Sequence, residues 1–286
     1  MARSVGERIA TARGSEVVSS RPLSGGCVGQ VALVVLASGE QLVAKSGGTA
    51  LDTEGWMLRV LAERSRLPVP EVYVSDPDLL VMGYIPGETG CRPEAETHAA
   101  ELLADLHGVT AGSFGFERDT LIGGLRQPNE PANEAGSSWI GFFRERRLLY
   151  MAGECVRAGR APGALLDRVR ALAERLPELI DEPEAPALLH GDLWGGNILS
   201  AGGRVTGFID PAVCYGHPEI ELAFTTLFST FSPEFYEAYA SRRPIRDGFF
   251  ETRRDLYNLY PLLVHTRLFG GAYLAQAEQT LSRFGV

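Results

Sequence analysis

The sequence is short of paired cysteines, long apolar runs and positive charge. Its four cysteines, Cys27, Cys91, Cys155 and Cys214, are scattered and form no Cys-x-x-Cys pair. This spacing argues against a zinc site and a disulfide framework, so we expect a reducing, cytoplasmic location. Apolar runs such as 31–37 are too short to cross a membrane, and the first ten residues lack the apolar core of a secretory signal.

Charge narrows the range of partners. The chain has 27 basic and 36 acidic residues, a formal net charge of -9. A negative surface does not attract nucleic acid or an anionic membrane, so we expect neither as a partner. It tolerates a cationic small molecule. With 286 residues, of which 45% are hydrophobic, the chain can form two lobes with a sizeable core.

Apolar periodicity changes along the chain. In the first part, residues 4–12 could form a short helix, with Ser4 and Glu7 as a possible capping box. Strand-like patterns and one longer helical pattern follow. The predicted strands are 28–36, 41–45, 71–74 and 79–84, and the predicted helix is 51–64. Beyond Pro86-Gly87, helical spacing dominates at 96–106, 138–156, 164–176 and after 218, with a loop at 112–136 and a strand-rich patch at 187–209.

The segment 188–199 carries the strongest chemical signal. Apolar residues flank a glycine-containing turn, in which Asp192 and Asn197 are five positions apart. This is the spacing of a kinase catalytic loop, where the Asp accepts the proton of the acceptor hydroxyl and the Asn binds magnesium. A second carboxylate, Asp210, follows the apolar run 205–209, and a short hairpin would bring it to the same metal as Asn197.

Each motif alone is also an ordinary turn, but their order and spacing together predict Mg²⁺-dependent phosphoryl transfer from ATP. Asp192 is then the catalytic residue, and Asn197 and Asp210 hold the metal. Lys45 ends an apolar strand and Glu54 lies beside the apolar face of the next predicted helix. An edge lysine and a solvated glutamate are the alternative, but with the downstream motif we expect a Lys45–Glu54 ion pair at the ATP phosphates.

Two further segments are candidates for nucleotide binding. Gly25 and Gly26 lie in a glycine-rich segment whose backbone N–H groups suit phosphates, although it matches neither common nucleotide motif and alone reads as a turn. Cys27, beside them, is either a reactive thiol or a buried small side chain, the more usual role. The strand at 79–84 would place Met82 behind the adenine, with the Gly83 carbonyl and the Ile85 amide bonded to it; a plain core strand is the alternative.

These motifs together resemble the fructosamine-3-kinase (ketosamine kinase) family, within the wider aminoglycoside-phosphotransferase group. The catalytic segment resembles the family's His-Gly-Asp-Leu-Trp-x-x-Asn. The other matching segments are Gly25-Gly26-Cys27, Leu103-Ala104-Asp105-Leu106-His107, Phe114-Gly115-Phe116, Gln127-Pro128-Asn129, Trp139 with Phe143 and Arg146-Arg147-Leu148, Asp210-Pro211-Ala212, Tyr215-Gly216-His217-Pro218-Glu219 and Glu221-Leu222-Ala223.

The resemblance implies an α+β, protein-kinase-like bilobal fold. Residues 1–84 would form a nucleotide-binding lobe, with a small antiparallel sheet and one helix, and 85–286 a mainly helical catalytic and substrate-binding lobe. It also implies phosphorylation of the 3-hydroxyl of a ketosamine, a fructosamine or ribulosamine, leading to deglycation. The substrate would be a small sugar-amine or glycated amine.

Alternatives remain at the level of sequence. An aminoglycoside or other small-molecule hydroxyl kinase would use the same scaffold, although Trp194 and the 127–148 motifs favour ketosamines. A catalytically silent nucleotide-binding module need not keep all five polar residues named above. Trp194 either stacks on the sugar or packs in the core. Glu219 either contacts the substrate amine or holds its loop, and His107, His217 and His265 are expected to be structural.

Overall fold

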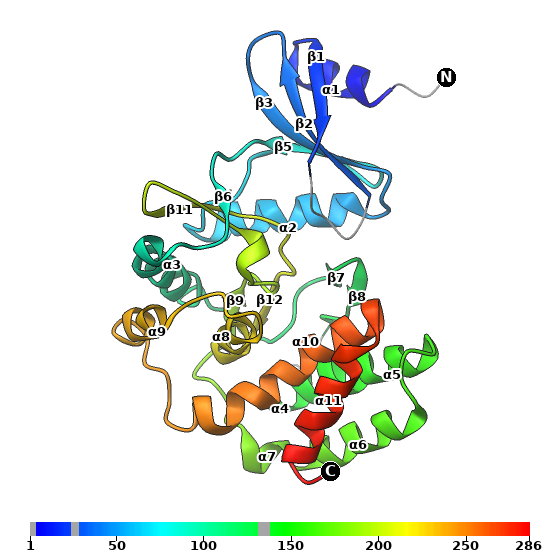
Figure 1. The fold of residues 1–286 in the computed structure, drawn as a ribbon, viewed down its shortest axis with the longest axis vertical. Helices are drawn as coiled ribbons and strands as arrows, with labels where there is room; N and C mark the ends of the chain where they lie inside the picture. The colour runs from blue at the N-terminus through cyan, green and yellow to red at the C-terminus, as the bar shows by residue number, and fades with distance from the viewer. Residues whose placement is uncertain (1–3, 24–28, 131–137) are drawn as a thin grey trace.

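The computed structural model describes residues 4–23, 29–130 and 138–286. Figure 1 shows a β-sheet with two helices at one end of the long axis and a larger group of helices at the other. The sheet is antiparallel, with strand order β1-β2-β3-β5-β4. Its strands are β1 (Val17–Pro22), β2 (Gln30–Leu36), β3 (Gln41–Ser46), β4 (Val72–Asp76) and β5 (Leu79–Gly83).

The two faces of this sheet pack against different helices. Helix α1 (Val5–Arg13) begins at the predicted capping box, in which Ser4 and Glu7 bond reciprocally, and buries Ile9 against one face. Helix α2 (Leu51–Arg64) packs Leu51 and Leu58 on the other face. Lys45 lies opposite Leu80 in the β3–β5 register, so its side chain projects from the α2 face.

Helices and short hairpins make up the rest of the chain (Figure 1). The helices are α3 (Pro93–Leu106), α4 (Trp139–Phe142), a π-helical stretch η2 (Phe143–Leu149), α5 (Tyr150–Arg157), α6 (Gly163–Glu174), α7 (Leu176–Leu179), α8 (Pro218–Leu227), α9 (Pro233–Ala240), a second π-helical stretch η4 (Phe249–Arg253), α10 (Arg254–Phe269) and α11 (Ala272–Arg283). One large buried cluster joins these helices to the apolar face of α2. No helix among the described residues is long and apolar enough to cross a membrane.

Two small antiparallel pairs carry the candidate catalytic segments. Strand β9 (Ala187–Leu189) pairs with β12 (Cys214–Gly216), and β10 (Ile198–Ala201) pairs with β11 (Arg204–Phe208) and with β6 (Glu88–Thr89). The 190–197 loop therefore leaves β9 and enters β10, passing through the 3₁₀ turn η3 (Gly195–Asn197). The segment 209–213 leaves β11 and enters β12. Backbone hydrogen bonds from Ala212 N–H to His190 O and from Ile209 N–H to Asn197 O hold the two loops side by side.

The predicted elements agree with this structure within a few residues, with three exceptions. The sheet packs against two helices, α1 and α2, and not against the one helix expected of this lobe. Strand β1 was not predicted because its solvent-facing residues give no apolar alternation, as is common for an edge strand. The predicted loop at 112–136 contains a hairpin, β7 (Thr120–Ile122) and β8 (Leu125–Gln127). Its two-residue turn, Gly123-Gly124, has φ of +53° and +79°, a conformation that favours glycine and is a recognised hairpin signal.

Candidate active site

Lys45 joins the sheet to the catalytic segments. Its Nζ lies 2.7 Å from Glu54 Oε1 of α2 and 2.5 Å from Asp210 Oδ1. The predicted Lys45–Glu54 pair is therefore present, and Asp210 is a second partner from 165 positions further along the chain. The lysine is buried. Burial lowers the pKa of Lys45, but the charges of Asp210 and Glu54 outweigh it and hold that pKa above its ordinary value, so the amine stays charged.

The catalytic loop depends on glycine at position 191. Gly191 has φ of +86°, and a Cβ there would lie 2.0 Å from the Ala212 carbonyl oxygen. The His190 and Ala212 backbones are joined by a 2.7 Å hydrogen bond, from Ala212 N–H to His190 O. The two polar loops can thus lie in contact only because no side chain separates them. Asp192 follows directly and is half-buried.

Asn197 ties the candidate base to the candidate metal loop. Its Nδ2 donates to Asp192 O at 2.8 Å and to Asp192 Oδ2 at 3.1 Å. Its backbone carbonyl accepts from Ile209 N–H at 3.0 Å, next to Asp210. The Asn197 amide oxygen has no hydrogen-bond partner in the described part of the chain. Asp210 itself has φ of +55°, a costly conformation for a residue with a side chain. The structure therefore brings Asp192, Asn197, Asp210 and Lys45 together.

Two carboxylates in one half-buried site repel each other. Burial, followed by the charge of Asp210, raises the pKa of Asp192 to about 7, although the hydrogen bond from Asn197 lowers it. A pKa near 7 suits a general base that works at neutral pH. Asp192 Oδ1 has no hydrogen-bond partner among the described residues, so this oxygen can accept a proton from a hydroxyl group.

Glu221, to which the sequence analysis assigned no role, holds the catalytic loop from behind. Its carboxylate is 3% exposed and accepts the His190 N–H at 3.2 Å and the Gly191 N–H at 2.6 Å. His107 Nε2 lies 3.0 Å away, and His107 Nδ1 contacts the Tyr239 hydroxyl at 2.7 Å. Burial raises the pKa of Glu221, but hydrogen bonds from His107 and Gly191 outweigh it and hold the pKa below its ordinary value. His107 is structural, as expected.

A second buried polar network supports the candidate metal loop. Gln127 Nε2 donates to Ala212 O at 3.0 Å and to Thr120 Oγ1 at 2.9 Å, while its Oε1 accepts from Tyr260 at 2.9 Å. Thr120 also accepts from Asn129 Nδ2 at 2.7 Å. Arg147 in turn donates to Asn129 Oδ1 at 2.7 Å. The Gln-x-Asn and Arg-Arg-Leu motifs therefore position the segment after Asp210.

The candidate adenine residues lie at the end of β5. Met82 is buried against α2, and Gly83 N–H donates to Glu71 O at 2.9 Å. The side chain of Ile85 packs on Gly207 of β11. Within the described ranges, the Ile85 N–H has no hydrogen-bond partner and is available to a ligand. The glycine pair Gly25-Gly26, together with Cys27, lies outside the described residues.

Trp194 and Glu219, the two candidate substrate residues, differ in position. Trp194 is 41% exposed, and its ring lies over Gly196 beside the catalytic loop. It is therefore not a core residue. Glu219 is buried, and both its oxygens accept from Arg253, at 2.7 and 2.8 Å. This pairing favours the alternative in which Glu219 holds its loop over the one in which it contacts a substrate amine.

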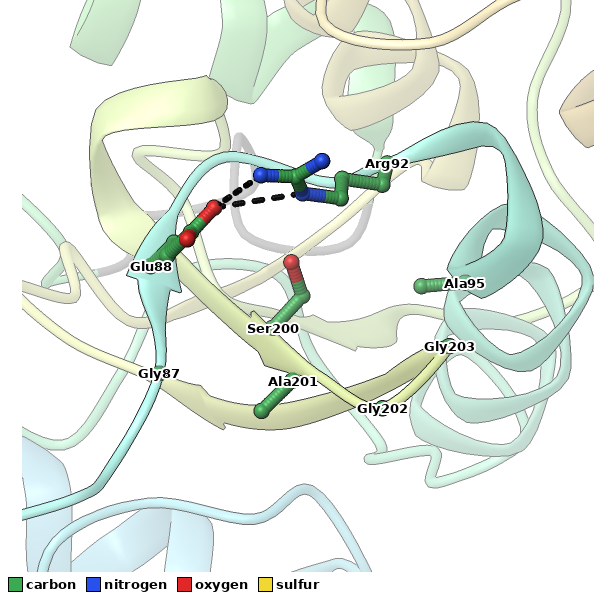
Figure 2. Close-up of a pocket in the computed structure, with 8 residues that line it drawn as sticks. All are labelled: Gly87, Glu88, Arg92, Ala95, Ser200, Ala201, Gly202 and Gly203. Atoms are coloured by element: carbon green, nitrogen blue, oxygen red, sulfur yellow. Dashed lines mark hydrogen bonds and ion pairs between the residues drawn. The ribbon is translucent and has the colours of Figure 1, made fainter.

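One cavity lies apart from these residues. It has a volume of about 480 Å³ and lies between the β6 segment, the start of α3 and the β10–β11 turn. Figure 2 shows Arg92 turned toward Glu88 at its edge, above Ser200. Its lining residues are Gly87, Glu88, Arg92, Ala95, Ser200, Ala201, Gly202 and Gly203. None of the candidate catalytic residues lines this cavity, so it is not the active site.

Comparison with known proteins decides between the kinase families that share this arrangement. The sequence profile of the fructosamine kinase family matches residues 1–284. The chain belongs to this family. A probable ketoamine kinase of Synechocystis is 36% identical over 92% of this chain and 89% of its own. A chloroplastic protein-ribulosamine 3-kinase of Arabidopsis thaliana is 29% identical, covering 95% of this chain and 84% of its own.

Solved structures agree with the family and the fold. The crystal structure of a candidate fructosamine-3-kinase from Thermobifida fusca has a TM-score of 0.86 and 32% identity, and the match covers 99% of this chain and 98% of that one. An aminoglycoside phosphotransferase in complex with AMP-PNP and hygromycin B has a TM-score of 0.61 at 18% identity, covering 98% of this chain and 97% of its own. At this low identity, the second match shows only that the two proteins share a fold. The predicted α+β, protein-kinase-like fold is confirmed.

Asp192→Asn is expected to stabilise the ligand-free protein at neutral pH. The pKa of Asp192 is raised from 3.8 to about 7 in the folded state, so the wild type loses stability as pH rises through that window. We expect the free energy of unfolding of the variant to exceed that of the wild type by on the order of 1–3 kcal/mol above pH 7. Near pH 4 the difference should be much smaller. Thermal unfolding of both proteins across this range measures the difference. A difference independent of pH would contradict the position assigned to Asp192.

Glu221→Gln is expected to weaken both folding and turnover. The amide would direct its NH₂ group toward backbone N–H donors, which costs about 2–4 kcal/mol in the free energy of unfolding. Urea unfolding and kcat/KM measure the two effects. Glu237→Gln, an exposed position on α9, is the matched control and should change neither. If the two variants behave alike, the Glu221 carboxylate does not hold the loop.

Proposed function

We propose that this chain is an ATP- and Mg²⁺-dependent kinase that phosphorylates the 3-hydroxyl of a ketosamine. The observation that carries the proposal is the meeting of Asp192, Asn197, Asp210 and the Lys45–Glu54 pair at one edge, in a chain of the fructosamine kinase family. In this assignment, residues 1–84 bind the nucleotide and residues 85–286 carry the base and the acceptor site. The scattered cysteines favour a cytoplasmic location.

Asp192 acts on the acceptor hydroxyl. Its Oδ2 is held by Asn197, which fixes the carboxylate while Oδ1 faces the hydroxyl. The hydroxyl proton passes to Asp192 as the oxygen forms a bond to the γ-phosphorus of ATP. The bond from that phosphorus to the β–γ bridging oxygen breaks, and ADP leaves. The protein contributes mainly by positioning and by electrostatic stabilisation, as is usual for phosphoryl transfer.

Asn197 and Asp210 suit a magnesium ion. Each has an oxygen without a hydrogen-bond partner in the described residues, and Mg²⁺ prefers a few hard oxygen ligands together with phosphate oxygens and water. When bound, the ion would neutralise negative charge on the phosphates. Lys45 is charged and fixed by Glu54, so it can bind phosphate oxygens beside Asp210. The Ile85 amide would bond the adenine, with Met82 behind it.

The acceptor follows from the relatives. A plant relative is named a protein-ribulosamine 3-kinase and bacterial relatives are named ketoamine kinases, which supports a ribulosamine or fructosamine as acceptor and O3 as the site. The exposed Trp194 ring beside the base suits stacking on a sugar or contact with its ammonium group. A ketosamine 3-phosphate decomposes and releases the amine, so the proposed role is deglycation.

Turnover of a ketosamine is the first expectation. Purified protein with ATP and Mg²⁺ should phosphorylate a ribulosamine or fructosamine, and the product should release phosphate and free amine on standing. ADP formation, measured for a ketosamine, an aminoglycoside and choline, separates the alternatives. Turnover of the aminoglycoside alone would keep the mechanism but overturn the acceptor. No turnover of any acceptor would favour a nucleotide-binding module.

Asp192→Asn should abolish most of this activity while leaving nucleotide binding intact. Removing the proton acceptor lowers kcat by roughly 10²–10⁴-fold, whereas the residues that bind the nucleotide are unchanged. Stopped assays for kcat and calorimetry with an ATP analogue measure the two quantities. Asp105→Asn, at an exposed position on α3, is the control. Near-normal turnover in Asp192→Asn would remove Asp192 from its role.

A further inference from the structure

A row of aromatic rings leads away from the candidate active site. It begins at Trp194, two residues after Asp192, and continues through Phe228 and His265 to Phe269 and Tyr273. The ring centroids are 5.9 Å apart for Trp194–Phe228, 5.2 Å for Phe228–His265, 5.8 Å for His265–Phe269 and 4.8 Å for His265–Tyr273. We call these five side chains the aromatic row. Every ring is within contact distance of the next.

Three helices build the aromatic row. Phe228 follows α8, and His265 and Phe269 are one turn apart on α10, which packs against both α8 and α11. The turn Gly270-Gly271 has φ of +67° and +59° with ψ of -149° and -124°, a combination that is essentially restricted to glycine. This turn returns the chain on itself, so that Tyr273 in the first turn of α11 contacts His265 and Phe269.

The aromatic row is open to solvent at both ends. Trp194 is 41% exposed and Phe269 is 54% exposed, while the three rings between them are half-buried. In the described part of the chain, the exposed large apolar side chains are Val5, Val18, Trp194, Phe250 and Phe269. Two of these, Trp194 and Phe269, therefore stand at the open ends of the aromatic row, and Trp194 is two residues from Asp192. Apolar surface arranged in this way is typical of a binding site.

The central ring of the aromatic row is uncharged. His265 Nδ1 lies 2.8 Å from the Pro261 carbonyl oxygen, so Nδ1 carries the hydrogen and Nε2 presents a lone pair. Burial lowers the pKa of His265, although the bond to Pro261 raises it, so the ring is neutral near pH 7. Nε2 has no hydrogen-bond partner among the residues described. An apolar row with one acceptor suits methylene groups, aromatic side chains and an N–H donor.

We infer that the aromatic row binds the group attached to the ketosamine nitrogen, and that the preferred group is a peptide with an apolar side chain next to the modified lysine. This inference rests on the proposed function. With the sugar at Asp192, the ammonium lies beside Trp194, where a ring face attracts a cation. The four-carbon stem of a lysine covers about one ring-to-ring step. The rings beyond it, up to Phe269 and Tyr273, are left for a neighbouring side chain.

A separate cavity offers a competing surface. It has a volume of about 720 Å³, lies between α9, η4 and the start of α10, and includes Phe250. None of the five residues of the aromatic row lines it, and neither does Asp192. Phe250 is 40% exposed, similar to the open ends of the aromatic row. Phe250→Ala is therefore a matched control for Phe269→Ala, since both remove an exposed phenyl group.

The test compares acceptors that carry the same ketose. One is the methylamine adduct, and two are short peptides with a modified lysine followed by either Phe or Gly. For the wild type we expect kcat/KM to be roughly tenfold higher for the Phe peptide than for the Gly peptide. Phe269→Ala and Tyr273→Ala should each reduce this ratio toward one, chiefly through KM, and leave kcat/KM for the methylamine adduct unchanged. Phe250→Ala should leave the ratio as in the wild type.

The other outcomes overturn the inference in distinguishable ways. Equal kcat/KM for the Phe and Gly peptides in the wild type would show that the aromatic row does not read the neighbouring residue. Loss of the preference in Phe250→Ala, with Phe269→Ala unaffected, would move the site to the separate cavity. If no ketosamine is a substrate, the proposed function fails and the inference fails with it. The melting temperature of each variant is expected to lie within a few degrees of the wild-type value. Thermal unfolding measures it and excludes a folding defect.

Discussion

The ion pairs of Lys45 are the interaction on which the rest of the structure depends. A buried ammonium is strongly destabilising unless opposite charges surround it, and breaking one buried pair leaves an uncompensated charge. Here one partner, Glu54, comes from α2 on the same sheet, and the other, Asp210, comes from the end of β11. The pairs therefore fix the position of the sheet relative to the catalytic loops. They also leave a charged amine at the place where nucleotide phosphates would lie.

The opposite side of the site is held by groups that the proposed mechanism does not use. Glu221 accepts two backbone N–H groups of the catalytic loop, and Gln127 donates to the loop that follows Asp210. Both side chains are buried and satisfied. This support is needed because the site contains unfavourable features, namely the left-handed backbone of Asp210 and the raised pKa of Asp192. Strain and charge repulsion at a functional site persist only where the surroundings determine the geometry.

The site residues that were predicted from the sequence are marked by patterns within short stretches of the chain. Asp192 and Asn197 are close in sequence, Asp210 follows a short hairpin, and Lys45 and Glu54 lie on neighbouring elements whose apolar faces are visible from periodicity. The strands and helices around them were predicted for the same reason. Glycine spacing likewise anticipated the tight catalytic loop.

The parts that were missed depend on contacts between distant residues. His107 meets Glu221 across 114 positions and Tyr239 across 132, and no pattern in one sequence reveals such a pairing. Glu219 lies within a motif that suggested a substrate contact, but Arg253, 34 positions later, occupies its carboxylate. Strand β1 is an exposed edge without alternation, whereas the Gly123-Gly124 turn did carry a local signal for the β7–β8 hairpin.

The most direct test of this account is a crystal structure with a non-hydrolysable ATP analogue, Mg²⁺ and a ketosamine bound together. We expect the 3-hydroxyl oxygen to lie within hydrogen-bonding distance of the Asp192 carboxylate, the metal to be coordinated by Asn197 and Asp210, and Lys45 to contact the phosphates. A sugar that presents a different hydroxyl would correct the regiochemistry. A hydroxyl far from Asp192, or a metal bound elsewhere, would contradict the central claim that these residues form one phosphoryl-transfer site.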